Sequence, residues 1–122
     1  MLDHVSIKVA DFARSKAFYD KALAPLGLKM VMGDGQFFAG YGDERPFFWI
    51  GQNQGPVGTG THIAFSAKDR ATVDAFYAAA MAAGGADNGG PGLREHYHPT
   101  YYGAFVLDPD GHNVGAVCHA AG

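Results

Sequence analysis

Residues 61–67 read Thr-His-Ile-Ala-Phe-Ser-Ala, and they repeat the pattern of residues 3–9, which read Asp-His-Val-Ser-Ile-Lys-Val. His62 stands 58 positions after His4, and the match continues at this offset, without a gap, as far as Gly85. A register held over that length indicates an internal duplication. Two histidines are therefore expected to occupy one structural position in two copies of a module.

Each copy carries the signals of a βαβββ unit. Residues 4–9 alternate polar and apolar side chains, which is the period of a half-buried strand, and residues 62–67 open the second copy in the same way. Asp11 and Asp69 are acceptable N-caps, and a helix with one apolar stripe is expected to follow each of them. The remaining strands are expected at residues 28–32, 36–41 and 46–50 in the first copy, and near 93–97, 101–107 and 113–118 in the second.

The length of the chain suits a single compact domain that spans all 122 residues. The expected organisation of residues 1–122 is module one at 1–52, a glycine-rich linker at 51–60 and module two at 60–119. The last strands of the two modules align at a larger offset of 66 positions, because the second copy has eight more residues in its glycine-rich loop. This alignment pairs Trp49 with Gly115.

Charge and composition argue against several classes of partner. A net charge of −3 and a pI near 6.0 give no attraction to phosphate backbones or anionic lipids, so no nucleic-acid or membrane partner is expected. Nothing approaches the roughly 18 uninterrupted apolar residues that a membrane span needs. The single cysteine, Cys118, rules out an internal disulfide and favours a cytoplasmic location.

Residues 101–114 carry the most specific motif. They read Tyr-Tyr-Gly-Ala-Phe-Val-Leu-Asp-Pro-Asp-Gly-His-Asn-Val, and they resemble the terminal hairpin of the vicinal oxygen chelate superfamily, the group of glyoxalases, bleomycin-resistance proteins and extradiol dioxygenases. The histidine that opens each module is similar to the first-strand metal ligand of that family. The resemblance covers nearly the whole chain. It implies an α+β fold in which two tandem βαβββ modules form a curved mixed sheet around a cleft.

The resemblance also implies a divalent ion held by a first-strand residue and a last-strand carboxylate from each module. His4 and His62 match the first-strand positions. The last-strand positions fall on Trp49 and Gly115, neither of which can ligate a metal. Because metal sites usually have three or four protein ligands, the expected cofactor is at most a weakly bound divalent metal (Zn, Ni, Mn or Fe). Trp49→Glu and Gly115→Glu are then expected to strengthen binding, whereas the alternative is that both histidines are hydrogen-bonded structural residues.

Aromatic residues are the other candidates for the cleft. Phe47 and Trp49 share one face of their strand, glycine at position 115 leaves space opposite, and Tyr101 and Tyr102 bring one hydroxyl each to the mouth of the loop. The predicted ligand-binding residues are Phe47, Trp49, Tyr101, Tyr102 and Gly115, and the predicted ligand is small and hydrophobic or aromatic. Core packing is the alternative role for the aromatic residues. No catalytic residue is assigned.

Further polar residues are given structural or solvent-exposed roles. Asp108 and Asp110 are expected to hydrogen-bond the backbone of their own turn. Glu95, His96 and His98 lie near the long loop and are expected to be exposed to solvent.

Two functions fit the sequence. The favoured hypothesis is a small-molecule-binding protein of the glyoxalase or bleomycin-resistance type, without the full metal site. The alternative is a divalent-metal-dependent lyase, isomerase or dioxygenase of the same superfamily, which needs carboxylates that the last strands lack. A homodimer is expected, because Phe47, Trp49 and Val117 are apolar groups on the cleft side that a second copy could cover.

Overall fold

The computed structural model describes residues 2–52, 56–58 and 60–121. The first half contains β1 (Val5–Lys8), α1 (Phe12–Ala22), a 3-10 helix (Ala24–Leu26), β2 (Lys29–Gly33), β3 (Phe38–Gly42) and β4 (Pro46–Gly51). The second half contains β5 (His62–Ser66), α2 (Arg70–Ala82), β6 (Ala86–Asp87), β7 (Gly92–Leu93), β8 (Tyr102–Leu107) and β9 (Asn113–Cys118). Residues 53–55 and 59 of the predicted linker lie outside the described residues.

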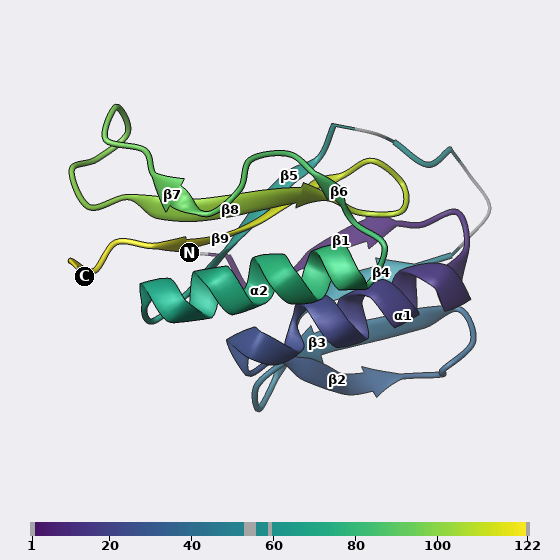
Figure 1. Ribbon diagram of the computed structural model, residues 1–122. Helices are drawn as coiled ribbons and strands as arrows, with labels where there is room; N and C mark the ends of the chain where they lie inside the picture. The colour runs from purple at the N-terminus through teal and green to yellow at the C-terminus, as the bar shows by residue number, and fades with distance from the viewer. Residues whose placement is uncertain (1, 53–55, 59, 122) are drawn as a thin grey trace.

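The strands form two mixed sheets, one from each half of the chain (Figure 1). The order is β1-β4-β3-β2 in the first sheet and β5-β9-β8-β6 in the second, where β7 also pairs with β8. In each sheet the opening strand runs parallel to the last strand, and the other pairs are antiparallel. The predicted α+β fold is confirmed, with the curved surface divided into two sheets.

Strand register repeats between the halves as the sequence alignment predicts. Val5 pairs with Phe48 in the first sheet, and Ile63 pairs with Val114 in the second, which reproduces the offsets of 58 and 66. The neighbouring antiparallel strands follow a different offset, because Trp49 pairs with Gly40 on β3 whereas Gly115 pairs with Phe105 on β8. Gly40 and Phe105 lie 65 positions apart, so the segment from Phe105 to its partner Gly115 is one residue longer than the segment from Gly40 to its partner Trp49.

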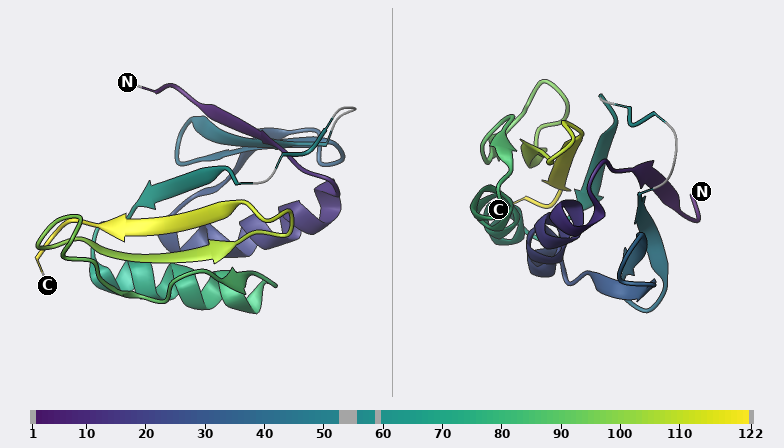
Figure 2. Two further views of the ribbon diagram at one scale, coloured as in Figure 1. Left: turned by 90° about the horizontal axis from the view of Figure 1, so that it is seen from above. Right: turned by 90° about the vertical axis from the view of Figure 1, so that its right-hand side faces the viewer.

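The two helices lie side by side, and each packs against the sheet of its own half (Figure 2). Asp11 and Asp69 cap them as predicted, since Asp11 accepts the N–H of Arg14 and Asp69 accepts the N–H of Thr72. The core between helices and sheets includes the buried side chains of Phe18, Tyr19, Phe48, Phe76, Val106 and Val114. Among the described helices, none is long and apolar enough to cross a membrane.

The turn between β8 and β9 joins the two halves through buried polar contacts. The Tyr19 hydroxyl donates to the Asp108 carboxylate at 2.5 Å, and both residues are buried. Burial and the neighbouring Asp108 charge raise the pKa of Tyr19 well above its usual range, so the hydroxyl keeps its proton. Asp110 accepts the N–H of Ala10 at 3.2 Å instead of bonding its own turn, so the prediction for Asp110 is wrong. Asp108 does bond its own turn, because its other oxygen accepts the N–H of His112.

One predicted strand is largely replaced by loop. Residues 93–97 were expected to be extended, yet β7 covers only Gly92–Leu93, and a turn follows. Together, β6 and β7 form an interrupted edge on β8, because Ala86 pairs with Leu107 while Gly92 pairs with Gly103. The additional residues of the second copy therefore leave the sheet twice, between β6 and β7 and between β7 and β8. These two loop segments supply one side of the pocket described below.

Candidate functional site

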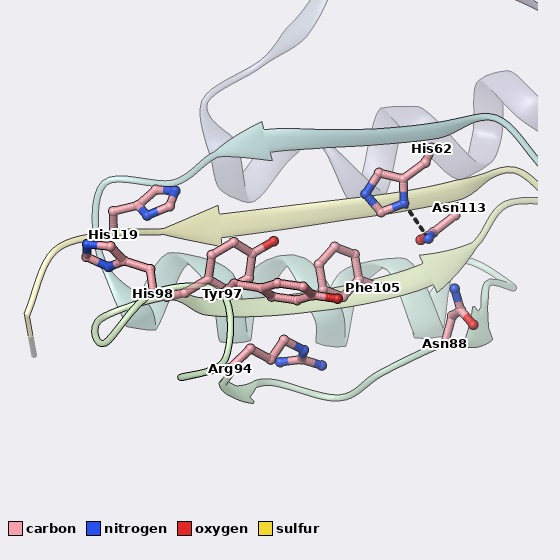
Figure 3. Close-up of a pocket in the computed structure, with 9 residues that line it drawn as sticks. His62, Asn88, Arg94, Tyr97, His98, Phe105, Asn113 and His119 are labelled. Atoms are coloured by element: carbon pink, nitrogen blue, oxygen red, sulfur yellow. Dashed lines mark hydrogen bonds between the residues drawn. The ribbon is translucent and has the colours of Figure 1, made fainter.

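The largest pocket described lies on the face of the second sheet that is turned away from α2, and it has a volume of about 590 Å³ (Figure 3). We call it the second-sheet pocket. Its lining residues are His62, Asn88, Arg94, Tyr97, His98, Tyr101, Phe105, Asn113 and His119. The volume is within the range of protein sites that bind small molecules.

Strand alternation explains why some of the lining residues share one face of the second sheet. His62 pairs with Asn113 across β5 and β9, and paired residues point to the same face of a sheet. Phe105 pairs with Gly115 on that face, opposite the face on which Val114 is buried against the core. Asn88, Arg94, Tyr97, His98 and Tyr101 line the pocket from the interrupted edge beside β8, and His119 lines it just after β9.

Arg94 holds the loop wall of the pocket through backbone carbonyl groups. Its guanidinium donates to the carbonyl oxygens of Gly92 at 2.8 Å, Gly103 at 2.6 Å and Gly90 at 3.0 Å. The guanidinium carbon also lies 5.2 Å from the centre of the Phe105 ring, a cation–π distance. These contacts fix a cation at the pocket wall and tie both loop segments to β8.

The pocket histidines have defined partners. The Asn113 amide contacts His62 Nδ1, and the imidazole ring of His62 lies 5.6 Å from the Phe105 ring. His98 Nδ1 accepts the backbone N–H of Thr100 at 3.2 Å, so in this arrangement the proton of the neutral ring is on Nε2. His98 is exposed as predicted, but it also lines the pocket.

An aromatic ring occupies the space above each of two cleft-side glycines. A Cβ atom added at Gly115 would lie 2.3 Å from Phe105 Cδ1. A Cβ atom added at Gly40 would lie 2.9 Å from the Trp49 ring. In the first half the aromatic residue, Trp49, is on the last strand, and its partner Gly40 is on the neighbouring strand. In the second half the positions are exchanged, because Gly115 is on the last strand and Phe105 is on the neighbouring strand. The space expected above Gly115 is therefore filled by Phe105.

The other predicted site residues are distributed over the structure. His4 and Phe47 line a pocket of about 230 Å³ beside Phe65, at the junction of the two halves. His4 and Trp49 line another of about 300 Å³, whereas His62 and Tyr101 line the second-sheet pocket. None of these three pockets contains both histidines.

Tyr102 belongs to the helix side of the second sheet. Its hydroxyl donates to Asp74 on α2 at 2.6 Å, a bond that raises the pKa of Tyr102, and Arg70 lies 5.1 Å from its ring. Strand alternation explains this direction, because Tyr102 pairs with the buried Cys118 rather than with a pocket residue.

One group of three metal-ligating side chains is present in the described part of the chain. The ligand atoms of Asp108, Asp110 and His112 lie within 4.8 Å of one another, so these residues could hold a divalent metal. All four carboxylate oxygens already accept hydrogen bonds, from Tyr19 and backbone N–H groups at Asp108 and from Ala10 and Ser15 at Asp110. A metal would therefore compete with the contacts that join the two halves.

No sequence pattern identifies Arg94, Asn88 or Tyr97 as a site residue. The eight-residue insertion was the available signal, because added loop residues beside a sheet edge often carry function. Asn113 and Phe105 could also have been found from strand alternation, since both share the face of Gly115.

Comparisons with known proteins agree with this fold. A family model described as the Glyoxalase/Bleomycin resistance protein/Dioxygenase superfamily matches residues 1–115. A glyoxalase/bleomycin resistance protein from Albidiferax ferrireducens T118 is similar at 31% identity and a TM-score of 0.86, over 97% of this chain and 98% of that one. A lactoylglutathione lyase from Agrobacterium tumefaciens is similar at 21% identity and a TM-score of 0.71, over 97% of this chain and 92% of that one. The second likeness shows the fold alone, and no curated protein matched the chain.

Proposed function

Because the chain belongs to the glyoxalase/bleomycin resistance protein/dioxygenase superfamily, we propose that it binds a small hydrophobic or aromatic molecule in the second-sheet pocket without the full metal site of that family. The observation that carries this proposal is the Phe105 ring, which covers Gly115 where the family resemblance expects a carboxylate. A ring at that position supplies an apolar wall and no metal ligand.

The composition of the pocket supports binding rather than metal-assisted chemistry. Tyr97, Tyr101 and Phe105 provide aromatic surface, and the Tyr97 and Tyr101 rings lie 5.0 Å apart, close enough to pack as a pair. Asn88 and Asn113 add amide groups that could orient a ligand. Mostly aromatic walls with a few polar groups are typical of small-molecule sites.

His4 and His62 remain the proposed metal ligands, for a weakly bound divalent ion such as Zn, Ni, Mn or Fe. Their repetition at one strand position favours this role, and it also supports the alternative function as a metal-dependent lyase, isomerase or dioxygenase. Against strong binding, His4 Nδ1 lies 2.8 Å from Asp3, a contact that lowers the pKa of Asp3 and occupies one ring nitrogen.

Two equivalent histidines provide the experiment that separates these functions. His62→Ala is expected to weaken the binding of 2-naphthamide to chelator-treated protein by roughly fivefold, because one polar contact is worth about 1 kcal/mol. His4→Ala serves as the matched control and should leave this affinity unchanged, because His4 does not line the second-sheet pocket. Calorimetry measures both. If the two variants lose affinity equally, and only when metal is present, the metal-dependent function takes precedence.

We also propose a homodimer that covers the exposed apolar face of the first sheet. Met32 is 55% exposed and Phe38 is 44% exposed, and the Phe38 ring lies 6.3 Å from the half-buried Trp49. Val117 was expected to contribute to this interface, but it is only 7% exposed and is not available for the contact. Light scattering should give twice the monomer mass of 12.9 kDa.

The dimer prediction has a matched control. Met32→Ser together with Phe38→Ser should produce the monomer mass, because the two changes remove the exposed apolar contact. Leu93→Ser removes a side chain that is 45% exposed in the other half, and it should leave the dimer intact. A wild-type mass near 12.9 kDa at micromolar concentration would contradict the proposal.

A further inference from the structure

Arg94 carries a charge that no carboxylate neutralises in the described part of the chain. Its three hydrogen bonds go to neutral backbone carbonyls, and it takes part in none of the ion pairs found there. A guanidinium has five N–H groups, so two remain without a protein acceptor among the described residues. The carbonyl bonds and the Phe105 ring hold this cation in place at the pocket wall.

The rest of the pocket favours negative charge. Among its nine described lining residues there is no aspartate or glutamate, although the chain as a whole has a net charge of −3. His98 carries its proton on Nε2, because Nδ1 accepts from Thr100, and His62 does the same when the Asn113 amide donates to its Nδ1. Each imidazole then supplies an N–H donor to the pocket, in addition to the N–H donors of the guanidinium.

Resting on the proposed function, we infer that the ligand of the second-sheet pocket is an aromatic carboxylate, whose negative charge is bound by Arg94. Tyr97, Tyr101 and Phe105 supply the surface for the ring, and the fixed guanidinium supplies the charge-assisted partner for the carboxylate. Because Arg94 is already held by three carbonyls, little side-chain entropy is lost when it binds an anion. A neutral aromatic amide of the same shape would fill the pocket without this partner.

The test compares 2-naphthoate with 2-naphthamide by calorimetry on chelator-treated protein. The wild-type protein is expected to bind the acid at least about tenfold more tightly than the amide, as a charge-assisted hydrogen bond predicts. Arg94→Gln should abolish that preference, and Arg94→Lys should retain part of it. Arg70→Gln is the matched control, because Arg70 also lies over an aromatic ring but contacts Tyr102 on the helix side of the sheet.

Each outcome decides between defined alternatives. If the acid and the amide bind equally well, the inference that the ligand is an aromatic carboxylate is wrong, whereas the proposed function is still supported. Binding of neither probe by folded protein would overturn both. The inference assigns the preference for the acid to Arg94. It is therefore also wrong if the Arg94→Gln variant still prefers the acid. If Arg94→Gln does not fold, the Arg94 Nε–H resonance of the wild-type protein is the second measurement, and at saturation it must move farther downfield with 2-naphthoate than with 2-naphthamide.

Discussion

Replacing Asp108 with alanine is expected to destabilise the protein by roughly 3–5 kcal/mol, because it leaves several buried donors unpaired at about 1–3 kcal/mol each. These donors are the Tyr19 hydroxyl and the N–H groups of Asp110 and His112. Asp108 is 5% exposed and Tyr19 is fully buried, so water cannot easily replace the lost acceptor. Urea unfolding monitored by circular dichroism measures the change.

Tyr19→Phe removes one of these bonds and should cost about 1.5–3 kcal/mol, the range for hydrogen bonds to charged groups. Its duplicate in the second half, Tyr77, is the matched control. The Tyr77 hydroxyl donates to Asp87 at 3.0 Å in an exposed position, so Tyr77→Phe should change stability by no more than about 0.5 kcal/mol. Equal effects of the two tyrosine variants would show that the buried contact between the halves is not a major source of stability.

Gly115→Ala is expected to destabilise the protein by about 1–3 kcal/mol, the usual cost of overpacking. The added Cβ atom would lie 2.3 Å from Phe105 Cδ1 and 3.0 Å from the Ala104 carbonyl oxygen. In the Phe105→Ala background the same change should cost much less, because the ring that it meets is gone. The coupling energy from this double-mutant cycle is therefore expected to be about 1 kcal/mol or more.

Gly51→Ala is the control for this cycle, because a Cβ atom there meets nothing closer than 4.0 Å. It should be nearly neutral in unfolding experiments. The same geometry bears on the expected effect of Gly115→Glu on metal binding. The glutamate would have to displace the Phe105 ring, so we expect metal binding to strengthen more when Gly115→Glu is combined with Phe105→Ala. Independent costs of the Gly115 and Phe105 changes would mean that the ring does not fill this position.

Periodicity and internal repetition predicted most of the fold. The offsets of 58 and 66, the alternation of β1 and β9 and the two aspartate caps all follow from local sequence patterns, and the structure reproduces them. The exchange of Trp49 and Phe105 between strands was missed. It depends on one extra residue in the segment that joins Phe105 to Gly115, compared with the segment that joins Gly40 to Trp49, and this residue shifts the β8 partner of Gly115 relative to the first half.

The candidate site was predicted only in part. His62 and Tyr101 line the second-sheet pocket, and Gly115 lies beneath its Phe105 wall. Arg94 could not be identified, because its role depends on backbone carbonyls from three separate positions that only the folded loop brings together. Loop conformation is set by such tertiary contacts and by glycine backbone angles rather than by a periodic pattern.

Ligand binding without metal can be tested by one calorimetric comparison. Protein treated with EDTA is titrated with 2-naphthoate or 2-naphthamide, whichever binds more tightly, and the titration is repeated with excess Zn²⁺, Ni²⁺ or Mn²⁺. We expect stoichiometric ligand binding by the EDTA-treated protein with no requirement for added metal, because the Phe105 ring covers Gly115 and Trp49 stands where the family resemblance expects the other last-strand carboxylate. Ligand binding that appears only when metal is added, together with tight and stoichiometric metal uptake by the unmodified protein, would contradict it.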